Sequence, residues 1–126
     1  MSPISKRADA GELRTLVYFK RIERTTDDEG FPKEKEVNVF GQDSDGRDLP
    51  AHVKWVNVHG YDVFTAVQLK LKEPATITMR YFPEISADMV VYKGTDPRPY
   101  EIISINNVED RSRWLEIKVQ RKVAAR

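Results

Sequence analysis

The chain carries two histidines, His52 and His59, and imidazole nitrogens are common ligands of zinc and other metals. If residues 51–59 form one regular strand, the two side chains point to opposite faces, because their positions differ by an odd number. They then cannot hold one metal ion together. The spacing therefore predicts that these histidines do not form a metal site.

A second candidate for metal chemistry is the acidic run over residues 43–48, which superficially resembles a calcium-binding loop. The EF-hand loop places glycine at its sixth position and a bidentate glutamate at its twelfth. Counted from Asp43, the glycine here is fourth, and the twelfth residue is Lys54. The run therefore predicts an acidic turn rather than a calcium site.

The sequence lacks the short motifs that carry catalysis in several common enzyme classes. It has no Gly-x-Ser-x-Gly nucleophile turn, no phosphate-binding glycine loop and no His-Glu-x-x-His zinc motif. No carboxylate stands within an apolar run that would prepare it for acid–base catalysis. We therefore predict a protein that is not an enzyme and that needs no cofactor.

Aromatic residues among lysines and arginines suggest one alternative, a small β-barrel module that binds nucleic acid by stacking bases. The net charge of +1 argues against strong phosphate attraction, and a β protein of this size needs aromatic residues for its core. Non-specific contact with DNA stays open, because it requires only a basic surface. The aromatic candidates are Tyr18, Trp55, Tyr81, Phe82 and Tyr92.

The elements that position these residues are short strands, because β-branched and aromatic residues alternate with polar ones and turn residues follow at short intervals. The pattern predicts an all-β fold, a small antiparallel β-barrel or sandwich. At 126 residues the chain is long enough for one modest core, and it has no cysteine for disulfides. The expected strands cover residues 13–24, 34–40, 51–58, 75–82, 89–93, 100–108 and 113–121.

The remaining segments define the expected domain organisation. Residues 1–10 are polar and aperiodic, which predicts a disordered N-terminal arm without a secretory signal. Residues 11–122 form the single β domain, and residues 123–126 a short tail. Residues 60–72 fit both helical and strand spacing, so they predict a long flexible loop or a short helix. No apolar run is long enough to span a membrane.

Charge is distributed unevenly along the chain. Residues 27–48 are mostly acidic, whereas residues 111–126 are mostly basic. Such opposite surfaces suit packing between copies of the chain or against a partner, although charged loops also simply favour solubility. The candidate contacts between subunits or with partners are Asp43, Asp45, Asp48, Arg121 and Lys122.

The order of several short motifs resembles that of the head–tail joining, or head-closure, proteins of tailed bacteriophages. The motifs are Leu13-Arg14, Lys20-Arg21, Asp28 with Gly30, Ala51 to Trp55, Gly60-Tyr61-Asp62 with Ala66, Ile77 with Arg80 and Tyr81, and Gly94 with Tyr100 and Ile102. The resemblance runs from about residue 11 to residue 119. The chain departs from the family pattern in having Asp62 in place of a glutamate and an extra loop over residues 41–50.

The resemblance implies a small β-barrel that assembles as a ring below the portal, extends or closes the DNA channel and provides the docking surface for the tail. The implied partners are portal or adaptor proteins, tail proteins and further copies of the chain, dodecameric when assembled and monomeric when free. The implied location is the virion, after synthesis in the cytoplasm of the bacterial host. A tail-completion or tail-terminator ring protein remains the alternative. The gating loop of the family would correspond here to Gly60, Tyr61, Asp62, Phe64, Gln68, Lys70 and Lys72.

Overall fold

The computed structural model of the protein describes residues 12–58 and 72–122. In these ranges the chain forms seven β-strands and the short 3-10 helix η2. The elements are β1 (Thr15–Thr26), β2 (Pro32–Asn38), β3 (Ala51–Asn57), β4 (Ala75–Arg80), β5 (Val90–Lys93), β6 (Tyr100–Asn107), η2 (Val108–Asp110) and β7 (Trp114–Arg121). Every strand expected from the sequence is present, and each observed bound lies within two residues of the expected one. The predicted N-terminal arm, the C-terminal tail and all of the 60–72 segment except Lys72 lie outside the described residues.

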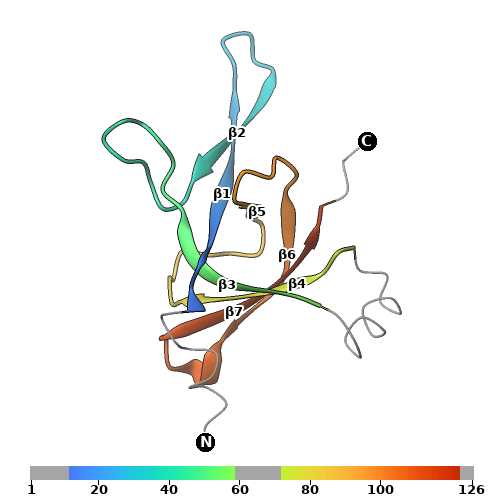
Figure 1. Cartoon of the computed structure of the whole chain (residues 1–126). Coiled ribbons are helices and arrows are strands. Elements are labelled where there is room, and N and C mark those ends of the chain that lie inside the picture. Colours follow the sequence, from blue (N-terminus) through green and yellow to red (C-terminus); the bar gives the residue numbers. More distant parts are fainter. Residues whose placement is uncertain (1–11, 59–71, 123–126) are drawn as a thin grey trace, which may run out of the picture.

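Six of the strands close into an antiparallel barrel (Figure 1). The order around the barrel is β1-β3-β4-β7-β6-β5, and β5 pairs again with β1, so that Val17 lies opposite Lys93 and Lys20 opposite Val90. Closure pairs backbone groups that an open sheet would leave exposed at its edges. The prediction of an all-β antiparallel fold is therefore confirmed, and the barrel is the form that it takes.

The core lies inside the barrel, because alternate residues of each strand point inward. On β7 the side chains of Leu115, Ile117 and Val119 are buried, as the alternation in the sequence predicts. On β1 Val17 and Phe19 are fully buried. Burial of each such large apolar side chain contributes about 1.5–3 kcal/mol to folding.

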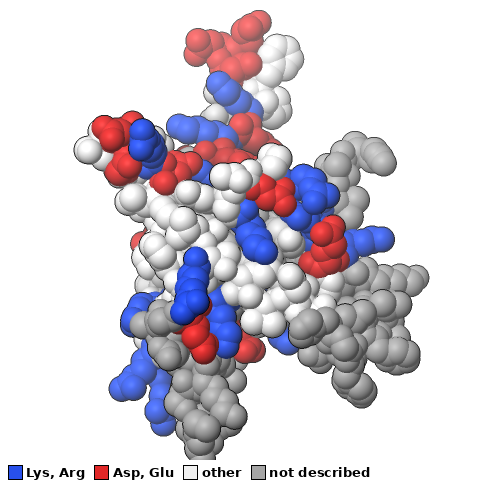
Figure 2. All heavy atoms as spheres, viewed as in Figure 1, with Lys and Arg blue, Asp and Glu red and all other residues white. Residues whose placement is uncertain are grey.

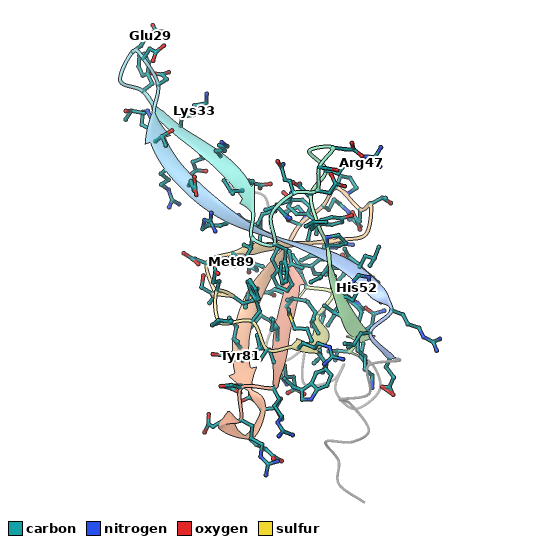
Figure 3. All side chains as sticks on the ribbon, turned by 90° about the vertical axis from the view of Figure 1, so that its left-hand side faces the viewer. Glu29, Lys33, Arg47, His52, Tyr81 and Met89 are labelled. Carbon is teal, nitrogen blue, oxygen red and sulfur yellow. The ribbon has the colours of Figure 1, made fainter. Side chains whose placement is uncertain are left out.

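Strand β1 is longer than the barrel that it helps to close. Lys20 is the last residue of β1 opposite β5 and the first opposite β2, and the pairing with β2 continues to Thr26 opposite Pro32. We call residues 21–37 the arm. The arm is a two-stranded hairpin that projects from the barrel (Figures 1 and 3). The residues of its outer half are exposed on both faces. Isolated two-stranded hairpins are marginally stable in water, so the arm depends on the barrel at its base.

Candidate functional site

The loop over residues 41–50 is a second projection beside the arm, and its tip is an ordered turn. The Asp43 carboxylate accepts hydrogen bonds from the backbone N–H groups of Asp45 and Arg47, both at 2.9 Å. Gly46 takes a φ of +81°, which favours glycine. The expected acidic turn is confirmed, and Asp43 stabilises it from within.

The tip of the arm is built in the same way. The Asp27 carboxylate accepts hydrogen bonds from the backbone N–H groups of Glu29 and Phe31, both at 2.9 Å, and Gly30 has a φ of +85°. In both turns the aspartate carboxylate accepts hydrogen bonds from backbone N–H groups that have no strand partner in the loop. The sequence pattern Asp-x-x-Gly therefore produces two matching projections, one at residues 27–30 and one at residues 43–46.

The base of the 41–50 loop is tied to the barrel by polar contacts. The side-chain amide of buried Asn38 donates to the carbonyl oxygens of Gly41 at 2.7 Å and of Leu49 at 2.9 Å. Asp48 forms an ion pair with Lys20 of β1. The hydrogen bonds from Lys20 and then Gln42 hold the pKa of the Asp48 carboxyl below its usual range. Asp48 thus anchors the loop, whereas Asp45 is exposed at its tip.

The basic candidate Arg121 lies at the end of β7 and also has partners within the chain. Its guanidinium lies 2.8 Å from the Asp96 carboxylate and 3.5 Å from that of Glu73. It also donates to the Arg98 carbonyl oxygen at 2.9 Å and stacks 4.1 Å above the Tyr100 ring centroid. The Arg121 side chain is only 12% exposed, so contacts within the chain cover most of its surface.

Lys122, the next candidate, differs from Arg121 in exposure. Its backbone N–H donates to the Pro99 carbonyl oxygen at 3.1 Å, while the residue is exposed.

Lys72 is the one residue of the expected gating segment that the structure describes. Its backbone N–H donates to the Gln120 side chain at 3.2 Å, and its carbonyl oxygen accepts from the Arg121 N–H at 2.8 Å. The other residues of that segment, Gly60, Tyr61, Asp62, Phe64, Gln68 and Lys70, lie outside the described residues.

The acidic and basic candidates have different partners within the described parts of the chain. Asp48 pairs with Lys20, and Arg121 pairs with Asp96 and Glu73. Figure 2 shows acidic side chains gathered at the tip of the arm and charges of both signs on the loop beside it. Contacts of Asp43, Asp45, Asp48, Arg121 and Lys122 with other subunits or partners stay a prediction.

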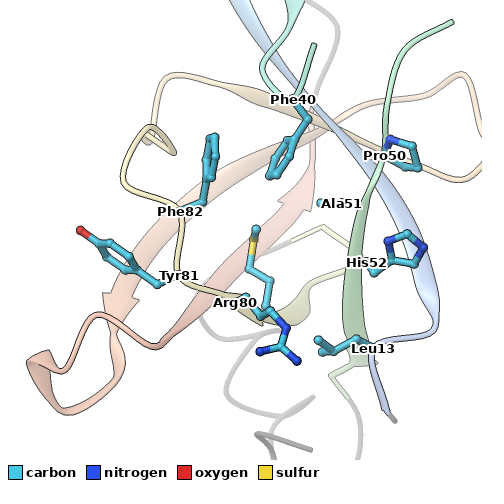
Figure 4. A pocket seen from close by; sticks show the side chains of 9 residues that line it. Leu13, Phe40, Pro50, Ala51, His52, Arg80, Tyr81 and Phe82 are labelled. Atoms are coloured by element: carbon cyan, nitrogen blue, oxygen red, sulfur yellow. The ribbon is translucent and has the colours of Figure 1, made fainter. Parts of the chain in front are cut away.

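A groove of about 350 Å³ opens in the barrel wall between β3 and the end of β4 (Figure 4). The two strands pair only from Lys54 opposite Thr78 to Asn57 opposite Ala75, so they diverge beyond Lys54. The groove is apolar inside and basic at its rim. Its lining residues are Leu13, Phe40, Pro50, Ala51, His52, Met79, Arg80, Tyr81 and Phe82.

Two stacked rings form one end of the groove. The ring centroids of Phe40 and Phe82 lie 4.4 Å apart with an interplanar angle of 23°. At the rim, the Arg80 guanidinium lies 5.3 Å from the Trp114 ring centroid, and His52 is exposed. The Phe40–Phe82 stack packs the segment after β4 on the segment after β2, and this contact holds the groove in shape.

Sequence reasoning missed two features of the arm. Phe31 at its tip is 62% exposed, the highest exposure among the exposed large hydrophobic residues of the described ranges. At its base, the Tyr92 hydroxyl lies 2.9 Å from both carboxylate oxygens of Glu36. The position of a large apolar residue between Gly30 and Pro32, within a turn, could have predicted the exposure of Phe31. The sequence held no signal for the Tyr92–Glu36 contact, because it joins β5 to β2.

Other kinds of site receive no support from the part of the chain that the structure describes. Residues 12–58 and 72–122 hold no cluster of three or more histidine, cysteine, aspartate or glutamate side chains suited to a metal ion. Within the same ranges, no helix has the length and apolar character needed to cross a membrane. Projections and a groove, rather than a cluster of reactive groups, are thus the distinctive surface features here.

Comparison with known proteins finds similar solved structures and one family. The chain is 21% identical to a protein of Shigella flexneri 2a whose structure was determined in solution, with a TM-score of 0.61 over 93% of this chain and 99% of that one. It is 15% identical to a chain in the virion of a native gene transfer agent particle, with a TM-score of 0.48 over 89% of this chain and 98% of that one. No curated protein matches the chain in sequence. The sequence pattern of the phage head completion proteins matches residues 8–122, which is most of the chain. The chain therefore belongs to the phage head completion protein family.

Proposed function

We propose that the protein assembles as a ring below the portal of a tailed phage, extends or closes the DNA channel and provides the docking surface for the tail. The observation that carries this proposal is the family match over residues 8–122. In this proposal, completion of the head takes place at the opening through which DNA enters and leaves. Further copies of the chain, portal or adaptor proteins and tail proteins are the proposed partners.

The shape of the molecule supports an assembly role. The closed barrel is a compact body, and the arm and the 41–50 loop extend from it (Figure 1). The outer arm is exposed on both faces, so it lacks the covering layer that stabilises most hairpins. A ring is built from heterologous contacts, in which each copy presents two unlike surfaces. Projections on one side of a rigid body supply such a surface.

The proposed role is structural and not enzymatic. A ring of this kind acts by shape and by contact, so the role requires no catalytic residues, metal or cofactor. Non-specific contact with packaged DNA fits the same role, because it requires only exposed lysines and arginines.

Three of the five aromatic residues that suggested base stacking have partners within the described residues. Trp55 packs edge-on against Tyr100 with 4.9 Å between ring centroids, Phe82 stacks on Phe40, and the Tyr92 hydroxyl contacts Glu36. Tyr81, in contrast, is 36% exposed, and Lys93 and Lys20 lie 4.7 Å and 5.8 Å from the ring centroids of Trp55 and Tyr18. The family match, rather than these contacts, therefore favours the assembly role over a nucleic-acid-binding module.

Deletion of this gene in the parent phage, followed by electron microscopy of the lysate, tests the proposal. We expect DNA-filled or leaking heads and finished tails that remain unjoined, and restoration of complete virions when the gene is supplied in trans. Normal virions without the gene would contradict the proposal. Complete tails attached to empty heads would place the protein in channel closure only.

A further inference from the structure

We propose that the tip of the arm of one copy docks in the β3–β4 groove of a second copy, with Phe31 as the anchor. The contact is heterologous, because the tip and the groove are different surfaces. This inference rests on the proposed function only in that the copies assemble with one another. It adds the two surfaces that meet and the residues that hold them.

The first observation is an apolar side chain fixed in an exposed position. The Phe31 backbone is held on both sides, because its N–H donates to the Asp27 carboxylate and its carbonyl oxygen accepts from the Asp27 N–H, both at 2.9 Å. The side chain nevertheless remains 62% exposed. A preorganised aromatic residue loses little conformational entropy on binding, which is why such residues serve as interface anchors.

The second observation is a concave apolar surface of suitable chemistry. The groove is lined by the stacked pair Phe40 and Phe82 and by Leu13 and Met79 (Figure 4). An aromatic anchor that enters an apolar pocket buries area from both partners. β3 and β4 separate at the groove. Among the described residues, the stretch of β3 beside the pocket therefore has no partner strand on the side that faces β4.

Charge complementarity selects the tip of the arm as the occupant. Asp28 and Glu29 precede Phe31 at the tip and are exposed, whereas Arg80 and exposed His52 stand at the rim of the groove. Docking of the tip therefore brings carboxylates towards a guanidinium. Such pairs guide association and orient the partners, and salt weakens them when they remain near solvent.

The occupant is a second copy because the arm points away from its own groove. Figure 3 shows Glu29 at the far end of the arm, while His52 and Tyr81 lie on the barrel. From Lys20 to Thr26 the paired strands extend about 20 Å at the usual rise of a β-strand. A paired hairpin of this length does not fold back onto its own barrel, but it reaches a neighbour. A heterologous contact of this kind closes a ring when the rotation between neighbouring copies divides a full turn.

The chain contains no cysteine, so cross-linking gives a direct test. Two single variants of the full chain, Lys33→Cys and His52→Cys, are mixed and treated with a short bismaleimide. Lys33 is exposed beside the tip of the arm, so Lys33→Cys reports on the tip and keeps the Phe31 anchor. We expect a heterodimer whose yield is several-fold above that from a mixture of Lys118→Cys and His52→Cys. Lys118 is a matched control, because it is also an exposed lysine on a strand, but lies on β7. Raised salt should lower the Lys33–His52 yield and not the control yield.

Equal yields from the two mixtures would overturn the inference. So would a different occupant of the groove. In a Ser5→Cys/His52→Cys double variant, an intramolecular cross-link stronger than the Lys33–His52 product would assign the groove to the N-terminal segment of the same chain. Lys33 and His52 are both exposed on strands, so the cysteine variants are expected to fold.

An assembly readout separates this inference from the proposed function. In the phage, Phe31→Ser should reduce the yield of joined virions, whereas Phe31→Leu, which keeps an apolar anchor, should restore most of it. If deletion of the gene blocks joining while Phe31→Ser leaves it unchanged, the docking inference fails and the proposed function stands. If the deletion itself leaves virions normal, the proposed function fails.

Discussion

The guanidinium of Arg121 lies 2.8 Å from the carboxylate of Asp96. The contact joins the end of β7 to the turn between β5 and β6, and so connects three strands at one end of the barrel. Arg121, a residue predicted to contact other subunits, is therefore a constituent of the folded monomer.

Reversal of charge should separate folding from assembly at two neighbouring positions. Arg121→Glu places a carboxylate beside Asp96 and Glu73, so its melting temperature should fall by several degrees, about the shift that 1 kcal/mol produces in a domain of this size. Lys122→Glu should melt like the wild type, because Lys122 is exposed. Thermal unfolding followed by circular dichroism makes the comparison. An unchanged melting temperature for Arg121→Glu would contradict the assigned role.

The same pair of variants tests the prediction of a basic contact surface. If Lys122 contacts an acidic neighbour, Lys122→Glu should reduce joined virions without lowering thermal stability. Normal virion yield from this folded variant would remove Lys122 from the interface. Arg121→Glu cannot serve alone, because a loss of assembly would also follow from a loss of folding.

Asp96 should make stability depend on pH in the acid range. The backbone N–H of Arg98 and then the Arg121 side chain donate to its carboxylate and hold its pKa below the usual value. The stabilisation is present above the pKa of the unfolded chain and is lost as pH falls through the lower folded pKa. The melting temperature of Asp96→Asn should therefore fall less between neutral pH and strongly acid pH than that of the wild type. Parallel pH profiles for the two proteins would refute this assignment.

Tyr92 should be a tyrosine that ionises late. Burial first, and then the hydrogen bond to the Glu36 carboxylate, raise its pKa to about 12. Because the folded pKa is raised, this contribution to stability is present below the unfolded pKa near 10 and is lost as pH rises through 12. Glu36→Gln removes the negative charge and should lower the pKa of Tyr92. Ultraviolet titration of tyrosinate, with Tyr92→Phe to assign the signal, measures the change.

The barrel core should respond strongly to the loss of one side chain. Ile117 is fully buried on β7, opposite Ile77 of β4 and Ile105 of β6. Ile117→Ala should lower the free energy of unfolding by about 2–5 kcal/mol, and Ile117→Val by about 0.5–1.5 kcal/mol. Urea unfolding provides the measurement. Ile103→Ala on the exposed face of β6 is the control and should change stability little.

The two aspartate turns should be sensitive to glycine replacement, each in its own projection. Gly30→Ala and Gly46→Ala put a β-carbon on residues with positive φ, which should destabilise each turn by about 1 kcal/mol. A β-carbon at either position would meet no atom within 4 Å beyond the adjoining residues, so the effect is one of backbone strain. Amide hydrogen exchange should increase at the tip of the arm in Gly30→Ala and at the tip of the 41–50 loop in Gly46→Ala. Faster exchange throughout the barrel in either variant would contradict this local account.

The sequence by itself determined the strands, their inward faces and the turns. Alternation in Leu115, Ile117 and Val119 is a local property, because side chains of a strand point to opposite sides in turn. The aspartate and glycine of each projecting turn act within five residues, so their roles also follow from nearby sequence. The motif order indicated the phage head completion family, which the match over residues 8–122 confirms.

The tertiary structure decided how distant segments meet. Val17 pairs with Lys93, and this closure turns a row of strands into a barrel and leaves the rest of β1 to form the arm. The groove exists because β3 and β4 diverge beyond Lys54, while Phe40 and Phe82 pack together from different loops. Contacts of this kind depend on strand order and register. Alternating patterns within single strands do not specify which strand becomes the neighbour, so these surfaces emerge only when the barrel closes.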